Sequence, residues 1–320
     1  MTETLTAAIA RALLPARPES AHKYDFGRVL AVAGSLRYPG AAVLCTAAAA
    51  RAGAGVVTLA TTRDGMAAPG RTPEVTLLPL PADDGALGTS AADALRAELP
   101  NAQALLVGPG IGRETQTAAF LARLLGIETV PKRSVGFQMR PERPAEPVVA
   151  TATPALVLPP TVLDADALTL LATLPGWWEH VAPGTLVLTP HSGELQRLLG
   201  ETPIGADLAS AAIACAQRWQ QIVVAKGPTT VVAAPDGVAY TLHAPNPALA
   251  TAGTGDVLAG MIAGLLAQGA APTAAAVLGV YLHAQAGAQV RAHMGDAGAL
   301  ASDLLREIPL AIRALREGIA

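Results

Sequence analysis

A chain of 320 residues with a formal net charge of −3 lacks the basic surplus that nucleic-acid binding requires. Hydrophobic residues make up 51% of it, but many are alanine, and charged residues interrupt the apolar runs before the roughly 20 residues that a spanning helix needs. Glu3 and the absence of a basic N-terminal segment argue against a secretory signal. Cys45 and Cys215 are expected to be buried free thiols. We therefore expect a cytoplasmic protein without a membrane segment.

Apolar periodicity predicts strands and helices that alternate along the chain. The first helix is expected over Thr4–Leu14. Strands are expected at Arg28–Ala33, Val56–Ala60, Val75–Leu80, Ala104–Val107, Thr161–Leu163, Thr185–Leu188, Ile222–Ala225, Thr230–Ala234 and Val238–Leu242. Further helices are expected at Ala41–Ala52, Ser90–Leu99, Thr115–Leu125, Ala167–Leu174, Ala206–Trp219, Thr273–His293 and Ser302–Leu315. This alternation predicts an α/β fold, with a mostly parallel central sheet and helices on both faces.

The stretch from Asn246 to Gly269 is where we expect the chemistry. Gly253 and Gly255 precede a helix with apolar residues at helical spacing, and Asp256 follows them directly. Glycines at a helix start let several N–H groups point at one spot, where the helix dipole attracts phosphate. A carboxylate at that spot can take a proton from a hydroxyl that attacks phosphorus. The alternative is that Asp256 only caps the helix.

Glycines and acids also follow other predicted strands. Gly108–Gly112 reads GPGIG after one strand, and Asp164 and Asp166 follow another. The carboxyl ends of parallel strands are where open α/β sheets bind ligands. The two acids are candidates for a metal site, although Asp166 is also placed to cap the next helix.

Two further motifs offer polar groups. His191 and Glu194 begin a predicted helix three residues apart and can share one face, although Glu194 is also placed to complement the helix dipole. The segment Lys226–Thr230 offers backbone amides, hydroxyls and one cation, which suits the phosphates or ribose of a nucleotide.

The segment from Gly126 to Pro160 is rich in proline and basic residues, which disfavours both helix and inner strand. We interpret it, at about residues 127–160, as a surface insertion. The alternative is a lid in which Arg140 or Arg143 closes over substrate phosphates.

Taken in order, these motifs are specific. The segments GSLRYPGA, GAGVVTLAT, GPGIG, VLDADAL, LTPHSGE, KGPTT and NPALATAGTGDVLAGMIAGLLAQG resemble those of the ADP/ATP-dependent NAD(P)H-hydrate dehydratases, a ribokinase-like family. The resemblance runs from about His22 to Pro309. It implies a single ribokinase-like domain over residues 1–320. It also implies a hydro-lyase that repairs nicotinamide nucleotides by restoring NADH or NADPH from the S epimer of the hydrate.

In such a family, the terminal phosphoryl group of ADP or ATP passes to the hydrate hydroxyl with Mg²⁺ present, and phosphate is then eliminated. Matching motifs imply that Asp256 is the base and that the amides around Gly253 and Gly255 form the anion hole. The implied dinucleotide contacts are Ala41, Gly112, His191 and Asp256. The implied nucleotide contacts are Lys226, Gly227, Pro228, Thr229, Thr230 and Gly255. Glu194 would organise magnesium through water.

The resemblance also suggests a homotetramer. Because the epimerase domain often fused ahead of this one is absent, a separate NAD(P)H-hydrate epimerase is expected as pathway partner. Two other classes stay open: a thiazole or vitamin kinase of the same fold, and a dinucleotide-binding oxidoreductase or nucleotide sensor. Against the oxidoreductase, the first strand–helix turn reads GSLRYPG rather than G-x-G-x-x-G. The sequence does not choose between ADP and ATP, or between NADH-hydrate and NADPH-hydrate.

Overall fold

A computed structural model describes residues 2–67, 70, 72–127, 157–205 and 207–319. Within these ranges a ten-stranded sheet has the order β1-β12-β11-β10-β9-β8-β7-β2-β3-β4. Its strands are β1 (Thr2–Thr4), β2 (Arg28–Val32), β3 (Val56–Thr61), β4 (Thr76–Pro79), β7 (Ala104–Val107), β8 (Thr161–Leu163), β9 (Leu186–Leu188), β10 (Ile222–Ala225), β11 (Thr229–Ala233) and β12 (Ala239–His243). The seven strands from β10 to β4 are parallel, and β11 runs antiparallel to both of its neighbours.

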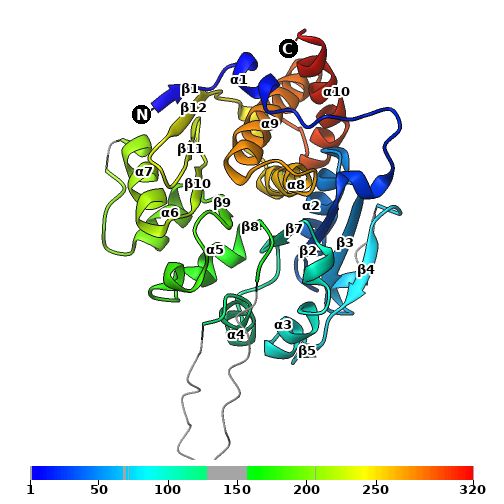
Figure 1. Ribbon diagram of the computed structural model, residues 1–320, viewed down its shortest axis with the longest axis vertical. Coiled ribbons are helices and arrows are strands. Elements are labelled where there is room, and N and C mark those ends of the chain that lie inside the picture. Colours follow the sequence, from blue (N-terminus) through cyan, green and yellow to red (C-terminus); the bar gives the residue numbers. More distant parts are fainter. Residues whose placement is uncertain (1, 68–69, 71, 128–156, 206, 320) are drawn as a thin grey trace, which may run out of the picture.

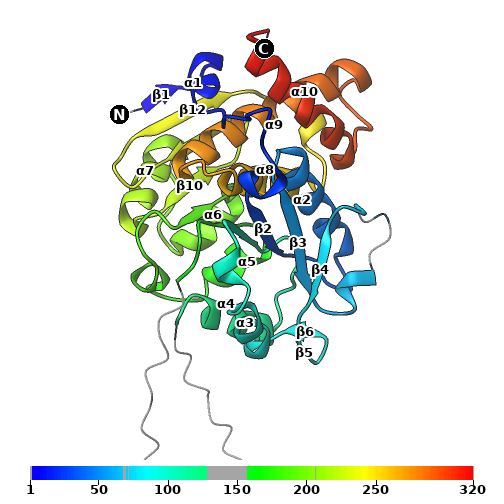
Figure 2. The same ribbon diagram turned by 45° about the vertical axis from the view of Figure 1, so that its right-hand side comes forward.

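Helices cover both faces of this sheet (Figures 1 and 2). One face carries α1 (Ala7–Ala12), α2 (Pro39–Arg51), α8 (Thr254–Ala267), α9 (Pro272–Met294) and α10 (Leu304–Glu317). The other carries α3 (Thr89–Leu95), α4 (Thr115–Leu124), α5 (Asp166–Leu171), α6 (Ser192–Leu199) and α7 (Leu208–Trp219). Strand residues alternate between the two cores: Val29 and Ala31 face the first, Leu30 and Val32 the second. The predicted α/β fold is confirmed.

None of the helices in the described ranges combines the length and apolarity that a bilayer crossing requires. The expected proline-rich insertion lies outside the described residues, apart from residues 127 and 157–160 at its ends.

One local prediction is wrong, and one small element was missed. Thr4 is not the start of a helix but the end of β1, whose parallel pairing with β12 is a contact that periodicity does not reveal. A small hairpin of β5 (Ala82–Asp83) and β6 (Ala86–Leu87) was not predicted. Its turn residues, Asp84 and Gly85, both have positive φ, which fits the Asp-Gly pairs typical of tight hairpins.

Helices α2 and α8 approach each other closely through glycine. A Cβ added at Gly260 would lie 2.1 Å from the Cys45 carbonyl oxygen, and one at Gly264 would lie 2.5 Å from that of Ala49. These are backbone atoms, which cannot move aside without separating the helices. Gly260 and Gly264 therefore fix the position of α8, and with it the Gly-rich loop at its start.

Adding one methyl at this contact is expected to destabilise the protein. We expect Gly260→Ala to lower the free energy of unfolding by roughly 1–3 kcal/mol, because the helices must separate to admit it. Gly40→Ala is the matched control. Gly40 lies in α2, the partner of α8 in this contact, and an added Cβ there would have no atom within 4 Å. This variant should be slightly more stable than wild type, because alanine is the better helix former. Urea unfolding measures both. Equal stability of the two variants would contradict the role given to Gly260.

Candidate active site

Polar residues converge where the parallel strands end. The loop Gly108–Gly112 follows β7, Asp164 follows β8, Thr189 follows β9 and Lys226 follows β10. The first turn of α8 lies beside them, since a Cβ built on Gly255 would be 3.3 Å from Nζ of Lys226 and 3.9 Å from Oδ2 of Asp164. The sheet edge thus brings the Gly-rich loop, an acid, a threonine and a lysine into one place.

The backbone at the start of α8 is shaped by Gly253. This residue is the N-cap of the helix and has a φ of +94°, a conformation that glycine adopts at no steric cost. Asp256 lies in the first turn, three residues beyond the cap, so the alternative interpretation of Asp256 as the cap is wrong. The first-turn amides of α8 are left free of intrahelical partners and face this end of the sheet, as an anion site requires.

Lys226 and Asp164 form a buried ion pair. Nζ of Lys226 lies 2.9 Å from Oδ1 of Asp164, which also accepts a hydrogen bond from the Thr189 hydroxyl at 2.8 Å. The side chain of Asp164 is 2% exposed and that of Lys226 is 20% exposed. This pairing could not be predicted from local motifs, because the two residues are 62 positions apart.

Three carboxylates share this lysine. Burial raises the pKa of Asp256 to about 7, repulsion from Asp164 adds to the rise, and Lys226 opposes it. Burial also raises the pKa of Glu194. Burial alone would lower the pKa of Lys226, but attraction to Asp164, Glu194 and Asp256 leaves it above its usual value. Asp256 therefore titrates near neutral pH, where a general base is most effective.

His191 and Glu194 cap α6 reciprocally. Nδ1 of His191 accepts hydrogen bonds from the amides of Gly193 and Glu194, while Oε2 of Glu194 accepts the His191 amide at 2.9 Å. Glu194 is buried with 6% exposure, whereas the His191 side chain is 54% exposed. Glu194 thus has a structural role at the helix start, and its carboxylate also contributes to the charge around Lys226.

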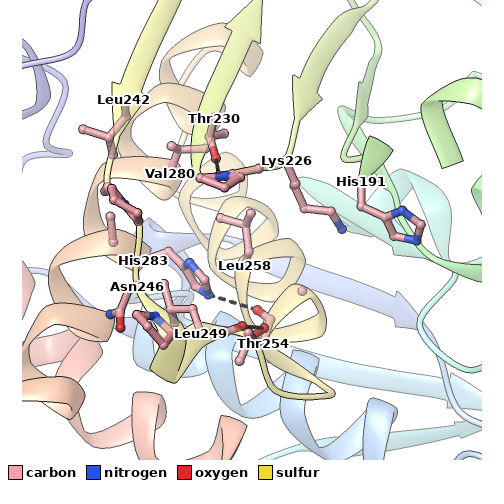
Figure 3. A pocket seen from close by; sticks show the side chains of 18 residues that line it. His191, Lys226, Thr230, Leu242, Asn246, Leu249, Thr254, Leu258, Val280 and His283 are labelled. Atoms are coloured by element: carbon pink, nitrogen blue, oxygen red, sulfur yellow. Dashed lines mark hydrogen bonds between the residues drawn. The ribbon is translucent and has the colours of Figure 1, made fainter. Parts of the chain in front are cut away.

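A cavity of about 640 Å³ opens beside Lys226 and the start of α8 (Figure 3). Its volume lies in the range of about 300–1,000 Å³ that is usual for small-molecule sites. Its lining comprises His191, Lys226, Gly227, Pro228, Thr230, Leu242, Ala244, Pro245, Asn246, Pro247, Leu249, Ala250, Thr254, Gly255, Leu258, Val280, His283 and Ala284. The cationic end at Lys226 and the apolar walls from β12, the following loop and α9 suit a ligand with a charged end and a flat apolar body.

His283 of α9 was missed at the sequence level, since a histidine within an alanine-rich helix carries no motif. Burial lowers its pKa to about 4, so the imidazole is neutral at pH 7. Its Nε2 lies 3.0 Å from the Thr254 carbonyl oxygen. A carbonyl only accepts, so Nε2 carries the proton and Nδ1 is an acceptor. His283 therefore links the cavity to the first turn of α8 (Figure 3).

Some residues expected at the site lie outside this cavity. The Thr229 hydroxyl pairs with Nδ1 of His243, and Thr229 does not line the cavity. Ala41 contacts the GPGIG loop, since a Cβ on Gly110 would lie 2.9 Å from that of Ala41. The Gly112 amide donates to Oδ2 of Asp166 at 3.1 Å.

Asp166 holds the GPGIG loop. Besides the Gly112 amide, its carboxylate accepts a hydrogen bond from Nε of Arg113 at 2.6 Å. Asp166 does not cap α5, because Ala165 is the N-cap and the helix start has no side-chain cap. A second cavity of about 290 Å³ adjoins this loop and the segment 34–37 after β2.

The site offers carboxylate oxygens to a magnesium ion, but the described residues do not form a complete coordination shell. The described residues contain no group of three His, Cys, Asp or Glu side chains placed to hold a metal. Asp164 and Glu194 nevertheless give the site a surplus of negative charge beside Lys226. Magnesium commonly keeps several waters and binds one or two carboxylates together with substrate phosphates, so the residues fit that mode.

Comparison with known families shows to which family the chain belongs. The family model for NAD(P)H-hydrate dehydratase matches residues 29–130 and 144–310. The chain belongs to this family. It is 35% identical to the ADP-dependent (S)-NAD(P)H-hydrate dehydratase of Xanthomonas campestris over 96% of this chain and 94% of that protein. It is 41% identical to the bifunctional NAD(P)H-hydrate repair enzyme Nnr of Moorella thermoacetica over 98% of this chain and 54% of that protein. The chain thus spans about half the length of the first curated relatives.

Solved structures agree with this family. An ADP/ATP-dependent NAD(P)H-hydrate dehydratase of Bacillus subtilis, co-crystallised with ATP and Mg²⁺, is 27% identical with a TM-score of 0.74 and 98% coverage of both chains. A hydroxyethylthiazole kinase of Pyrococcus horikoshii, 13% identical with a TM-score of 0.56 over 96% of this chain and 95% of that one, shares the fold alone.

The raised pKa of Asp256 predicts a pH-dependent stability in this dehydratase-family chain. With a pKa of 3.8 in the unfolded chain and about 7 in the folded protein, the folded state binds an extra proton between these values. Wild-type stability therefore falls as pH rises from 4 to 7. Asp256→Asn removes the titrating group and with it this loss of stability. The free energy of unfolding of the ligand-free variant should therefore equal that of wild type at pH 4 and exceed it by roughly 2–4 kcal/mol at pH 8. Urea unfolding at both pH values tests this, and a difference independent of pH would contradict it.

Proposed function

We propose that the chain is a dehydratase that uses ADP or ATP to restore NADH or NADPH from the S epimer of the hydrated dinucleotide. The observation that carries this proposal is Asp256, a carboxylate with a pKa near 7 at a Gly-rich helix start beside the Lys226–Asp164 pair. The dehydratase of Xanthomonas campestris, matched over nearly its whole length, supports the same activity.

The proposed reaction runs in two stages. Asp256 accepts the proton of the hydrate hydroxyl, and the oxygen attacks the terminal phosphorus of the nucleotide, which leaves as AMP from ADP or as ADP from ATP. The ring nitrogen's lone pair then expels phosphate as the carbon–oxygen bond breaks, and the adjacent carbon loses a proton. The products are the reduced dinucleotide and inorganic phosphate. The protein supplies positioning and charge neutralisation.

The amides at Gly253–Gly255 and Lys226 are proposed to hold the transferring phosphoryl group. The Thr254 amide donates to the Thr251 carbonyl at 3.4 Å. The other first-turn amides lie at the positive end of the α8 dipole, and the Lys226 ammonium adds a full positive charge beside them. The adenine nucleotide would occupy the 640 Å³ cavity, with Gly227, Pro228 and Thr230 along its wall. Thr229 is proposed to act through the backbone, because its hydroxyl is engaged by His243.

The dinucleotide is proposed to approach from the GPGIG side. Ala41 and Gly112 lie at the loop that Asp166 anchors, and His191 is exposed at the edge of the main cavity. In this arrangement Asp256 lies between the two ligands. Asp164 and Glu194 would hold magnesium through water, and the ion would offset charge on the phosphoryl oxygens.

We further propose a cytoplasmic homotetramer served by a NAD(P)H-hydrate epimerase. The partner follows from the chemistry, because the R epimer must be converted before an enzyme specific for the S epimer can use it.

The alternative is a small-molecule kinase, since a thiazole kinase shares the fold. The two reactions differ in their products. The test incubates the protein with hydrated NADH or NADPH, magnesium and either ADP or ATP. A dehydratase restores the absorbance of the reduced nicotinamide and releases phosphate. A kinase would accumulate a phosphorylated product without that absorbance.

Replacing Asp256 is expected to abolish turnover but not folding. Asp256→Asn should lower the rate by about 10²- to 10⁴-fold, because the variant cannot accept the hydroxyl proton. Asp207→Asn is the control, since Asp207 is the exposed N-cap of α7 and does not line the main cavity. Turnover is followed by nicotinamide absorbance. Near wild-type activity of Asp256→Asn would remove it from the role of base.

The lysine at the cavity is expected to act on the nucleotide. Lys226→Gln should raise the dissociation constant of the adenine nucleotide about tenfold, because the variant loses the proposed charge-assisted contact between Lys226 and the nucleotide phosphates. The dissociation constant of the reduced dinucleotide should rise much less, because the proposal gives that ligand no contact with Lys226. Glutamine keeps a hydrogen-bond donor for Asp164. Thr229→Val is the matched control. Calorimetry measures both ligands, and the reverse order of effects would place Lys226 on the dinucleotide side.

A further inference from the structure

A third cavity lies at the opposite end of α8 from the Gly-rich loop that precedes this helix. It is a cavity of about 270 Å³ between the segment after α1, the ends of α2 and α8, and α10. We call it the arginine pocket; its lining comprises Leu14, Pro15, Arg17, Arg51, Ala52, Gly53, Leu265, Gln268, Pro309, Ile312 and Arg316. The 14 residues of α8 span about 20 Å, and this length separates the pocket from the candidate active site at the start of the helix. Figures 1 and 2 show α1 and α10 side by side at this end of the molecule.

The charge of the pocket is unbalanced. Its described lining includes Arg17, Arg51 and Arg316 but no Asp or Glu. Within the described part of the chain, none of these arginines takes part in an ion pair, and the guanidinium of Arg51 has no hydrogen bond. Burial lowers the pKa of Arg17, and the charge of Arg316 lowers it further. Three uncompensated cations around one cavity favour binding of an anion.

Two of the guanidiniums are already held in place. Nη1 of Arg17 donates to the Gly53 carbonyl and to Oε1 of Gln268, and its guanidinium lies 3.7 Å from the centre of the Phe26 ring. Nη2 of Arg316 donates to the Pro15 carbonyl at 3.1 Å. Each guanidinium has five N–H donors, so most stay free. Groups fixed in advance lose little entropy when they bind a ligand.

The walls of the pocket restrict the ligand further. Leu14, Leu265, Pro309 and Ile312 are apolar, so a ligand with a small organic body would be better accommodated than a bare ion. The volume is slightly below the range of about 300–1,000 Å³ usual for drug-sized ligands, which excludes a whole dinucleotide. Guanidinium forks match carboxylate and phosphate oxygens alike. A phosphate carries up to two negative charges and three acceptor oxygens, so it can engage more than one of these arginines, which a single carboxylate does less well.

We propose that the arginine pocket binds a small organic phosphate carrying two negative charges, at a site independent of the catalytic cavity. The proposal uses no residue of the proposed catalytic machinery.

Phenyl phosphate and inorganic phosphate are the probes, and isothermal calorimetry is the measurement. The catalytic cavity is first saturated with a non-hydrolysable ATP analogue and magnesium, so that binding at the Gly-rich loop is suppressed. Phenyl phosphate should bind wild-type protein at one site, more tightly than inorganic phosphate, and more weakly as NaCl is raised. Failure of the analogue to bind would count against the proposed function, whereas the arginine variants alone decide this inference.

Arg51→Gln is the decisive variant, because the Arg51 guanidinium makes no hydrogen bond or ion pair with the described residues that the substitution would remove. It should weaken phenyl phosphate binding about tenfold, and Arg316→Gln should do the same. Arg313→Gln is the matched control on α10, exposed and outside the lining, and should bind like wild type. Unchanged thermal stability and turnover of Arg51→Gln would confirm its fold. Equal binding by wild type and Arg51→Gln, or no binding to wild type at 10 mM probe, would overturn the proposal.

Discussion

The candidate active site depends on one lysine shared among acids that repel one another. Asp164, Glu194 and Asp256 all act on Lys226, and the direct bond is to Asp164. Thr189 holds Asp164 from the other side, so the ion pair is fixed in place. Because the lysine only partly offsets the burial of Asp256, that carboxyl group keeps its proton until about pH 7. Any phosphate that enters must compete with Asp164 for the same ammonium group, which favours ligands that bring their own cations.

Much of the fold was predictable because buried strands and amphipathic helices leave a local pattern. The alternation from β2 to β10 and the hairpin of β11 and β12 follow from that pattern. β1 could not be predicted, because three polar residues become a strand only by pairing with β12, more than two hundred positions along the chain. The ends of some elements differ by a few residues from the prediction where caps decide them, as at Asp207, the N-cap that precedes α7.

Site residues that belong to a sequence motif could be predicted. Those that join the site through contacts between distant parts of the chain could not. Gly253, Asp256, Lys226 and His191 each belong to a segment with a recognisable order of residues. In the structure His191 and Lys226 line the main cavity, whereas Gly253 and Asp256 lie at the start of α8, whose Thr254 and Gly255 line it. The partners of these residues were not visible. Asp166 could be assigned to metal or cap from sequence, yet it binds the GPGIG loop, and His283 becomes relevant only because α9 packs against the start of α8. A shared fold with a thiazole kinase shows why function has to be argued from such contacts.

The placement of β1 has a consequence for how this chain tolerates attachments. β1 runs parallel to β12, and β12 ends at His243, next to the loop that lines the main cavity. Thr2 pairs with Ala239 at the start of β12, so the chain enters the sheet at the edge remote from the cavity. A fusion partner or affinity tag joined ahead of Thr2 would therefore emerge away from the ligand entrance. A bulky tag would disturb the pairing of the three-residue strand β1 with β12. It would not restrict the access of ligands to Lys226.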